Sequence, residues 1–397
     1  MKTLTTILGI ALSLFAQAEN GSFSSLQEAL NNPSKVQQLD LHEQGLTALP
    51  ADFGKLQNLE ILDLSGNRFS SFPIELLACK KLRAITLKGN HIDQLPANLN
   101  VLQQLEELSL SNGLSRTGKA ENSKTLPKVI TELKKLRVLD LSNWNLTEIP
   151  NYVADLHLQE LYLNNNSIAE LPASLFSKNL KVLDVSNNHL RTLPEAIANA
   201  NELRVLNLSG NQIESLPEAI GNMNELRYLN LASNKMLRPI IEIKKLIPIN
   251  HLAYLNISNT HTSILPENIS AFNSLEELDA SNNQLTSLPE SIGQMKQLQK
   301  LNVSHNRILE LPKSIYQLES LKTLSVSFNQ LISLPPMEDG LYHLETLDLS
   351  NNLSLATYPA NLTNLASVKI VNVKNTSLNR FQVEHLSEML NSAGLVY

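Results

Sequence analysis

The chain has 397 residues, of which 42% are hydrophobic, and a formal net charge of −6. These values allow a sizeable core. They argue against a dominant interaction with nucleic acid or an anionic membrane, because no basic stripe accumulates along the chain. The single cysteine, Cys79, excludes an intrachain disulfide, and its place after an apolar stretch predicts a small buried side chain rather than a reactive thiol.

Residues 1–18 have the features of a secretory signal peptide. Lys2 is followed by an apolar run over 4–15, and Ala16-Gln17-Ala18 has the small-x-small pattern of a cleavage site. The sequence therefore predicts cleavage after Ala18 and an exported protein, periplasmic or extracellular; a buried N-terminal helix is the alternative. No later stretch of about twenty apolar residues predicts a membrane span.

From Val36 to Leu378 a segment recurs about fifteen times, and successive copies mostly begin 22 or 23 residues apart. Its first half has the pattern L-x-x-L-x-L-x-x-N-x-L, as in Leu203, Leu206 and Leu208. A leucine spacing of two predicts a strand with these side chains pointing inward and the residues between them pointing outward. Stacked copies predict a parallel sheet with one face open to solvent.

The second half of the segment has the pattern L-P-x-x-I-x-x-L, as in Leu311, Pro312 and Ile315. Thirteen of the seventeen prolines occupy the L-P slot, where proline suits the first position of a helical turn. Spacings of three and four predict short helices or 3₁₀ turns on the convex side.

An asparagine recurs where the predicted strand ends. Its amide has donors and acceptors that can satisfy backbone groups of two adjacent copies, which predicts a structural role. These residues are Asn67, Asn90, Asn166, Asn188, Asn211, Asn234, Asn283, Asn306, Asn329 and Asn352.

The ends of a repeat stack need caps, because one copy alone cannot bury its core. Amphipathic stretches at 25–30 and 381–390 predict cap helices. The predicted organisation is a signal peptide over 1–18, an N-terminal cap over 19–35, repeats over 36–378 and a C-terminal cap over 379–397.

These motifs resemble the leucine-rich-repeat superfamily over about 340 residues. The L-P-x-x-I-x-x-L half most resembles the Ras-suppressor and scribble-like subgroup. Eukaryotic extracellular members usually have cysteine-clustered caps, and a sequence without them more closely resembles exported bacterial proteins. The resemblance implies an α/β solenoid of horseshoe form, with a parallel sheet on the concave face and short helices or 3₁₀ turns on the convex face. It also implies protein–protein interaction, usually through the concave face.

The repeat is interrupted at two places. The copy that begins at Leu105 is stretched by a polar loop over 113–125, and the next copy has Trp144, the single tryptophan, where asparagine is expected. Trp144 either shields the core beneath the loop or forms a binding edge with it, since tryptophan is favoured at interface hot spots. The second break, over 234–250, lacks the L-P slot and predicts a longer outer helix or turn with buried aliphatics.

The outward strand positions define the candidate face. One row carries aspartate or asparagine in most copies, which repeat consensus explains more simply than calcium binding or attraction of a basic partner. A less typical patch comprises Tyr162, Tyr228 and Tyr254, with Val182 and Val205 at matching positions between them. Either this patch contacts a protein partner or it reflects cross-strand packing. The predicted partner-binding residues are Trp144, Tyr162, Val182, Val205, Tyr228, Tyr254, Lys300, His305 and Phe328.

No P-loop, G-x-S-x-G or H-E-x-x-H motif is present, and the nine histidines are dispersed. The sequence therefore predicts no enzyme, no cofactor and no metal site. The favoured function is a non-enzymatic scaffold that binds a protein through the concave face. The alternative is a surface or envelope protein that binds glycan through its tyrosines.

Overall fold

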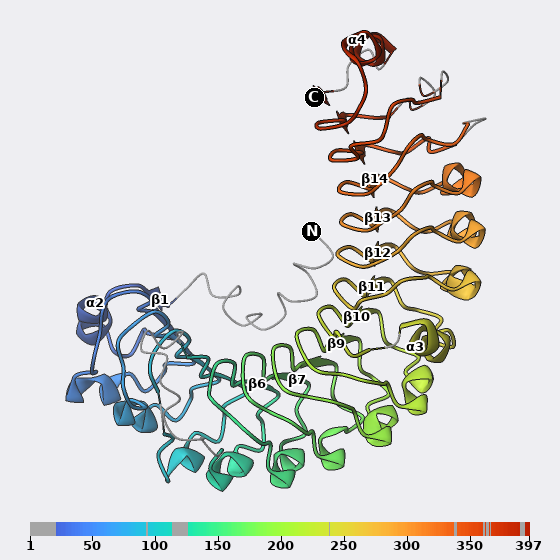
Figure 1. Ribbon diagram of the computed structural model, residues 1–397. Helices are drawn as coiled ribbons and strands as arrows, with labels where there is room; N and C mark the ends of the chain where they lie inside the picture. Colours follow the sequence, from blue (N-terminus) through green and yellow to red (C-terminus); the bar gives the residue numbers. More distant parts are fainter. Residues whose placement is uncertain are drawn as a thin grey trace. The chain divides into compact units, whose positions relative to one another are not determined.

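The computed structural model describes residues 21–397 except 93, 113–125, 238, 337–339, 360–361, 363–364, 366 and 390–393. The predicted signal peptide and the 113–125 loop therefore lie outside the described residues. The chain divides into two compact units, Met1–Val205 (unit 1) and Leu206–Tyr397 (unit 2). All seventeen strands of the described residues pair in parallel, and β9 (Val205–Asn207) spans the unit boundary (Figure 1).

Unit 1 has a short helix in the region of the predicted N-terminal cap. Helix α2 (Leu26–Asn31) starts after Ser25, whose hydroxyl accepts a hydrogen bond from the Glu28 backbone N–H at 3.3 Å. The remaining strands of the unit are β1 (Ser22–Phe23), β2 (Gln38–Asp40), β3 (Ile61–Asp63), β4 (Ala84–Thr86), β5 (Glu107–Ser109), β6 (Val138–Asp140), β7 (Glu160–Tyr162) and β8 (Val182–Asp184).

Unit 2 repeats the same arrangement and adds two longer helices, α3 (Pro239–Leu246) and α4 (Arg380–Met389). Helix α3 confirms the longer outer helix predicted for the second break, and α4 confirms the predicted C-terminal helix. The strands are β10 (Tyr228–Asn230), β11 (Tyr254–Asn256), β12 (Glu277–Asp279), β13 (Lys300–Asn302), β14 (Thr323–Ser325), β15 (Thr346–Asp348), β16 (Ile370–Asn372) and β17 (Gly394–Val396).

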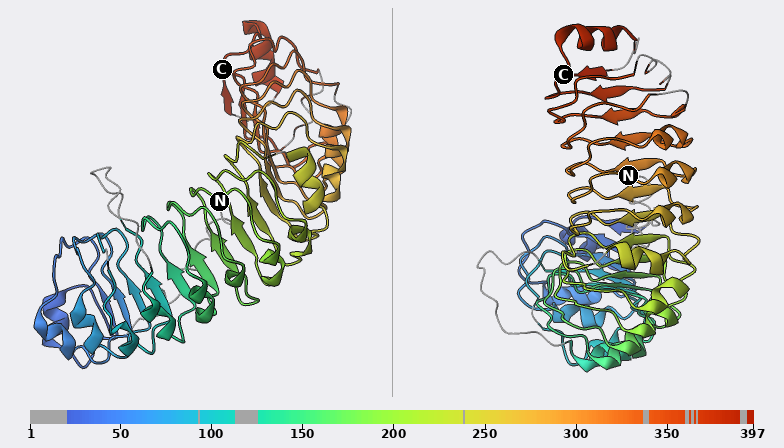
Figure 2. Two further views of the ribbon diagram at one scale, coloured as in Figure 1. Left: turned by 60° about the horizontal axis from the view of Figure 1, so that its bottom comes forward. Right: turned by 45° about the vertical axis from the view of Figure 1, so that its right-hand side comes forward.

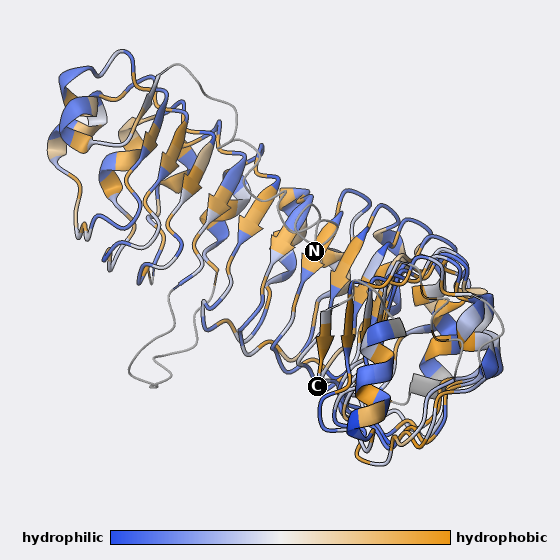
Figure 3. Ribbon diagram, turned by 90° about the horizontal axis from the view of Figure 1, so that it is seen from above, coloured by the Kyte–Doolittle hydropathy of each residue, from blue (hydrophilic) through white to orange (hydrophobic). Residues whose placement is uncertain are grey.

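Each three-residue strand of the repeats from β2 to β16 buries its middle side chain, as Leu206, Leu278 and Leu301 do. The first and third side chains point to the opposite side because strand side chains alternate. Hydrophobic residues accordingly follow the strands in both units (Figure 3). Isoleucines of the outer turns, such as Ile292 and Ile315, are also buried, so the core of each unit lies between its strands and its turns.

The predicted outer turns are confirmed as 3₁₀ helices, which lie away from the strands in each unit (Figure 2). In most of them the proline of the L-P slot is the residue just before the turn rather than its first residue. Its carbonyl accepts the first hydrogen bond of the turn, as in Phe53 N–H to Pro50 O at 2.9 Å. The turns are η2 (Ala51–Lys55), η3 (Ile74–Ala78), η4 (Leu99–Val101), η5 (Lys128–Glu132), η6 (Asn151–Leu156), η7 (Ala173–Leu175), η8 (Glu195–Asn199), η9 (Glu218–Asn222), η10 (Glu267–Ala271), η11 (Glu290–Gln294) and η12 (Lys313–Gln317).

The recurring asparagines bridge adjacent copies, as predicted. Asn306 donates from Nδ2 to the carbonyls of Val303 and Ala280 at 3.0 Å each, and its Oδ1 accepts from the Leu285 N–H at 2.9 Å. Asn90 makes the same three bonds in unit 1, with distances of 2.8, 2.9 and 3.0 Å. Each amide therefore satisfies three backbone groups that would otherwise be buried without a partner.

Trp144 occupies the turn position that the recurring asparagine has in other copies. It is 1% exposed, and its backbone N–H donates to Asn166 Oδ1 at 3.0 Å. This burial supports the alternative in which Trp144 shields the core of unit 1, whereas its role in binding a partner stays a prediction. Cys79 is likewise fully buried, as predicted.

Candidate protein-binding surface

The first and third side chains of the strands form one continuous face in each unit, here called the open sheet face. Parallel pairing places equivalent side chains of this face next to one another, because adjacent strands lie about 4.8 Å apart. The predicted partner-binding residues fall on both units: Tyr162, Val182 and Val205 belong to unit 1, and Tyr228, Tyr254, Lys300, His305 and Phe328 to unit 2.

Tyr228 and Tyr254 are register partners on β10 and β11 of unit 2. Their rings stack, with centroids 4.3 Å apart and an interplanar angle of 6°. Tyr228 is 5% exposed and Tyr254 is partly exposed, and burial raises the pKa of the Tyr254 phenol. The two rings therefore form a rigid apolar platform with neutral hydroxyl groups.

The same row continues with Glu277 on β12 and Lys300 on β13, which are also register partners. Lys300 Nζ lies 2.6 Å from Glu277 Oε1. The predicted cation of the patch is therefore paired with a carboxylate of the adjacent strand, which fixes its position beside the tyrosines.

His305 and Phe328 lie at the rim of the unit 2 face, in the turns that follow β13 and β14. Their rings stack with centroids 4.1 Å apart and an interplanar angle of 11°. Both residues have a left-handed backbone, with φ of 53° and 52°, and Phe328 is 47% exposed. Most copies place glycine or asparagine in this slot, among them Gly66, Gly89, Asn187, Gly210, Asn282, Asn351 and Asn375.

A bulky residue in the left-handed region is strained, since the Cβ approaches the following carbonyl, at a cost of about 1–2 kcal/mol. Phe328 therefore opposes local stability and exposes an aromatic ring. Leu309 and Ile332 of the same two copies are also exposed, and the Ile332 N–H donates to the Leu309 carbonyl at 3.3 Å. The sequence analysis missed Leu309 and Ile332, although both follow the strand asparagine by three residues.

In unit 1 the structure corrects the position of Tyr162. It pairs with Asp140 and Asp184, whereas the register partner of Val182 is Glu160. The leucine framework of that copy, Leu158, Leu161 and Leu163, places Tyr162 in the third strand position. The predicted alignment of Tyr162 with Val182 and Val205 is therefore wrong.

Unit 1 instead presents charged side chains on and beside strands β5, β6 and β7. Arg137 donates to Glu107 Oε1 and lies 3.5 Å from Glu106 Oε2, and the Tyr162 hydroxyl donates to Glu160 Oε2 at 2.8 Å. Burial raises the pKa of Glu107 to about 7 and also raises that of Glu160. The sequence analysis did not single out Glu107 or Glu160, although the leucine framework places both in the first strand position.

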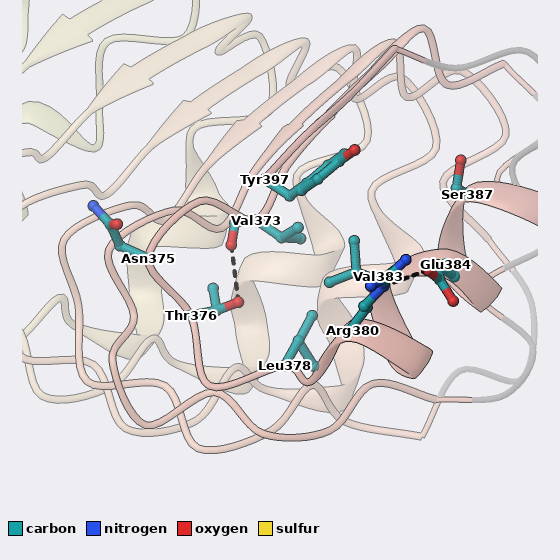
Figure 4. Close-up of a pocket in the computed structure, with 9 residues that line it drawn as sticks. All are labelled: Val373, Asn375, Thr376, Leu378, Arg380, Val383, Glu384, Ser387 and Tyr397. Atoms are coloured by element: carbon teal, nitrogen blue, oxygen red, sulfur yellow. Dashed lines mark hydrogen bonds and ion pairs between the residues drawn. The ribbon is translucent and has the colours of Figure 1, made fainter.

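A surface pocket of about 530 Å³ lies at the C-terminal cap of unit 2. Val373 and Tyr397 lie on one side of it, and Arg380, Val383 and Glu384 of α4 on the other (Figure 4). Its two charged side chains pair with each other, with Arg380 Nε 2.7 Å from Glu384 Oε1. The pocket therefore offers no uncompensated charged side chain to a ligand.

Across the described ranges, no three histidine, cysteine or acidic side chains lie close enough together to hold a metal ion. Within the same part of the chain, no helix has the length and apolar character needed to cross a membrane.

Comparison with known families identifies the architecture. Residues 34–92, 156–213 and 194–236 match the family "Leucine rich repeat", 238–309 match "Leucine-rich repeat region", and 135–156 match a further "Leucine Rich Repeat" family. Together these segments cover more than half of the chain. It is a leucine-rich-repeat protein.

Several solved structures resemble this leucine-rich-repeat protein. A leucine-rich-repeat protein of Leptospira interrogans is 27% identical, with a TM-score of 0.74 over 95% of this chain and 99% of that one. The functional domain of the internalin InlJ of Listeria monocytogenes is 20% identical, with a TM-score of 0.69 over 92% and 74%. No curated protein sequence matches the chain.

A plant relative adds an example of a bound ligand. The ectodomain of the Arabidopsis thaliana receptor kinase GASSHO1/SCHENGEN3 is 24% identical, with a TM-score of 0.57 over 94% of this chain and 51% of that one. That ectodomain was solved in complex with Casparian strip integrity factor 2. The leucine-rich-repeat fold is commonly a scaffold for protein–protein interaction. The Ras-suppressor and scribble-like subgroup stays a prediction.

Proposed function

We propose that this protein is a non-enzymatic scaffold that binds a protein partner through the open sheet face and rim of unit 2. The observation that carries the proposal is the exposed, left-handed Phe328 stacked on His305. A strained backbone conformation costs stability, and such residues cluster at functional sites. An exposed aromatic side chain is a typical anchor of a protein interface.

Two further features of unit 2 support this function. The Tyr228–Tyr254 stack provides a flat apolar platform, and the Glu277–Lys300 pair next to it provides polar contacts. Interfaces combine a few rigid aromatic anchors with a polar surround, which is the combination found on this unit.

The test is quantitative affinity capture from the native cell envelope and culture fluid, with three variants compared against the wild-type protein. Phe328→Asn and the Tyr228→Ala/Tyr254→Ala double variant are expected to lose the same captured protein. Ile74→Asn is the matched control, because Ile74 is 65% exposed on an outer turn of unit 1 and, like Phe328→Asn, this change replaces an exposed apolar side chain by asparagine. Equal capture by all variants at equal thermal stability would remove this proposal.

Glycan binding is distinguished by a glycan array, which is probed with the same variants. If a glycan array rather than capture gives a signal that depends on Tyr228 and Tyr254, the aromatic platform binds sugar rings and the protein-scaffold proposal is wrong.

We also propose that the protein is exported after removal of residues 1–18, on the basis of Lys2, the apolar run over 4–15 and Ala16-Gln17-Ala18. N-terminal sequencing of the protein from its native cells is expected to start at Glu19. A mature chain that starts at Met1 would contradict export by this route.

A further inference from the structure

A surface pocket of about 410 Å³ lies on one side of unit 2, here called the flank pocket. Its lining comes from three successive copies of the repeat, within 287–290, 310–313 and 333–336. These segments follow the strand asparagine and lead toward the outer side of each copy. The flank pocket is therefore separate from the open sheet face and its rim.

Apolar side chains form part of the flank pocket and of the surface beside it. Leu311 and Leu334 belong to the lining and are buried. Leu309 and Ile332, each of which directly precedes a lining residue in the sequence, are 47% and 52% exposed. The Ile332 N–H donates to the Leu309 carbonyl at 3.3 Å, so two exposed aliphatic residues of adjacent copies border the pocket.

The residue after the proline of the L-P slot changes along these copies. In the first copy it is Glu290, whose Oε2 accepts a hydrogen bond from the Ser314 N–H of the next turn at 3.2 Å. In the second copy it is Lys313 and in the third it is Pro336. Neither of these side chains has an acceptor for such a bond, so the flank pocket lies where this link between successive turns ends.

The charged side chains of the lining are Glu290, Glu310 and Lys313. Two carboxylates and one ammonium group give the lining a net charge of −1, and the whole chain has a charge of −6. Glu310 is exposed, and it forms no ion pair among the described residues. A basic segment is therefore attracted to the flank pocket and meets a carboxylate that is not already paired.

The geometry points to a second docking site, in which the flank pocket binds an extended segment of a protein partner that carries an apolar side chain and an arginine. Three copies span two strand spacings, about 10 Å, which an extended chain covers in about three residues at about 3.3 Å each. The apolar side chain lies against the leucines of the lining and the exposed Leu309 and Ile332. The arginine pairs with Glu310, because a guanidinium fork matches a carboxylate.

The site is tested by phage display of a random hexapeptide library against the whole protein. We expect the selected peptides to share an arginine within two residues of leucine, isoleucine or phenylalanine. A selected peptide is then synthesised with a fluorescein label, and its affinity is measured by fluorescence anisotropy. If no peptide is enriched over the bare support, or if the enriched peptides lack arginine, the proposed site is wrong.

Glu310→Lys tests the charge of the flank pocket. This variant is expected to weaken binding of the selected peptide at least about fivefold, because an attraction between exposed charges becomes a repulsion. A selection repeated on Glu310→Lys is expected to enrich aspartate or glutamate in place of arginine. Glu214→Lys is the matched control, because Glu214 is an exposed glutamate of unit 2 outside the lining. Equal weakening by both variants would show an effect of net charge alone and would contradict the site.

The Leu309→Ser/Ile332→Ser double variant tests the apolar contact. Loss of two aliphatic side chains from the contact is expected to weaken binding at least about tenfold. Met236→Ser is the control, because Met236 is 63% exposed in unit 2 and lies outside the lining, and it is expected to change the affinity by less than about twofold. Unchanged affinity of the double variant, at the thermal stability of the wild-type protein, would remove the apolar part of the site.

The same peptide separates this site from the proposed interface of unit 2. Phe328→Asn and the Tyr228→Ala/Tyr254→Ala double variant are expected to bind it as the wild-type protein does, even where they lose the captured partner. If these variants lose the peptide while Glu310→Lys retains it, the peptide binds the open sheet face or its rim, and the flank pocket is not a docking site.

Discussion

The two units build the same scaffold and present opposite chemistry on it. In unit 1 the open sheet face holds Glu107 and Glu160, with Arg137 paired to Glu107, whereas in unit 2 the corresponding face holds stacked tyrosines and the rim holds His305 and Phe328. Among the described residues, the exposed large hydrophobic side chains lie in unit 2, with Ile74 the exception in unit 1. The comparison shows that the inward positions of the repeat fix the fold while the outward positions are free to differ.

The first way to test this comparison is to break the shared scaffold in each unit. Asn90→Ala in unit 1 and Asn306→Ala in unit 2 each leave three backbone groups without the asparagine side chain. We expect each change to lower the free energy of unfolding by about 3 kcal/mol, since an unsatisfied buried group costs about 1–3 kcal/mol. Chemical denaturation measures the effect, and Gln330→Ala, at an exposed position, is the control.

If the free energy of unfolding fell by less than about 1 kcal/mol in one unit alone, the asparagines of the two units would not contribute equally. That result would contradict the expectation from their matching hydrogen bonds.

The second test contrasts two glutamates in equivalent first strand positions, Glu107 on β5 and Glu277 on β12. The folded-state pKa of Glu107 is raised to about 7, so the folded protein binds this proton more tightly than the unfolded chain and its stability falls as pH rises from about 4.5 to 7. At pH 8, Glu107→Gln is therefore expected to raise the free energy of unfolding by about 1–3 kcal/mol.

The gain from Glu107→Gln is expected to disappear at pH 4, where the carboxyl is protonated in both states. Glu277→Gln removes a partly exposed ion pair with Lys300 and is expected to lower stability by about 0–1 kcal/mol at pH 8. Thermal unfolding over a pH series measures both variants. A gain for Glu107→Gln that is equal at pH 4 and pH 8 would contradict the pKa argument.

The third test places an aromatic residue of unit 2 into the same turn slot of unit 1. Gly66 has a φ of 65°, and an added Cβ would lie 2.7 Å from Glu43 Cγ. We expect Gly66→Phe to lower stability by about 1–2 kcal/mol, which is the cost of the left-handed region for a residue with a Cβ atom. Denaturation of Gly66→Phe against Gly66→Asn measures it, and equal stability of the two would show that Phe328 is not strained either.

The fourth test reverses that exchange in unit 2 and has the smallest expected effect on stability. Phe328→Asn relieves left-handed strain but loses the stack on His305, so we expect a net gain of about 0–1 kcal/mol. Binding of the partner is expected to weaken about tenfold at the same time, because the exposed ring no longer contributes apolar contact. Differential scanning calorimetry combined with the capture assay measures both. A clear loss of stability would show that Phe328 serves the fold.

Much of the scaffold was predictable because its signals are local and repeated. The leucine spacing predicted the strands, the L-P slot predicted the 3₁₀ turns to within one residue, and Ser25 begins the predicted cap helix. The candidate surface was less predictable. Trp144 has the residue type of a binding anchor but lies in the core, and Tyr162 belongs to the third strand position rather than the first.

The sequence by itself determined the period, the inward leucines, the asparagine layer and the parallel order of strands, because each copy repeats the same short-range constraints. Only the tertiary structure decided which outward side chains meet. Arg137 reaches Glu107 across thirty residues, and Phe328 stacks on His305 across twenty-three, because parallel pairing brings equivalent and neighbouring positions of adjacent copies close together. Charge pairing, burial and ring stacking therefore depend on neighbours that no single copy of the repeat contains.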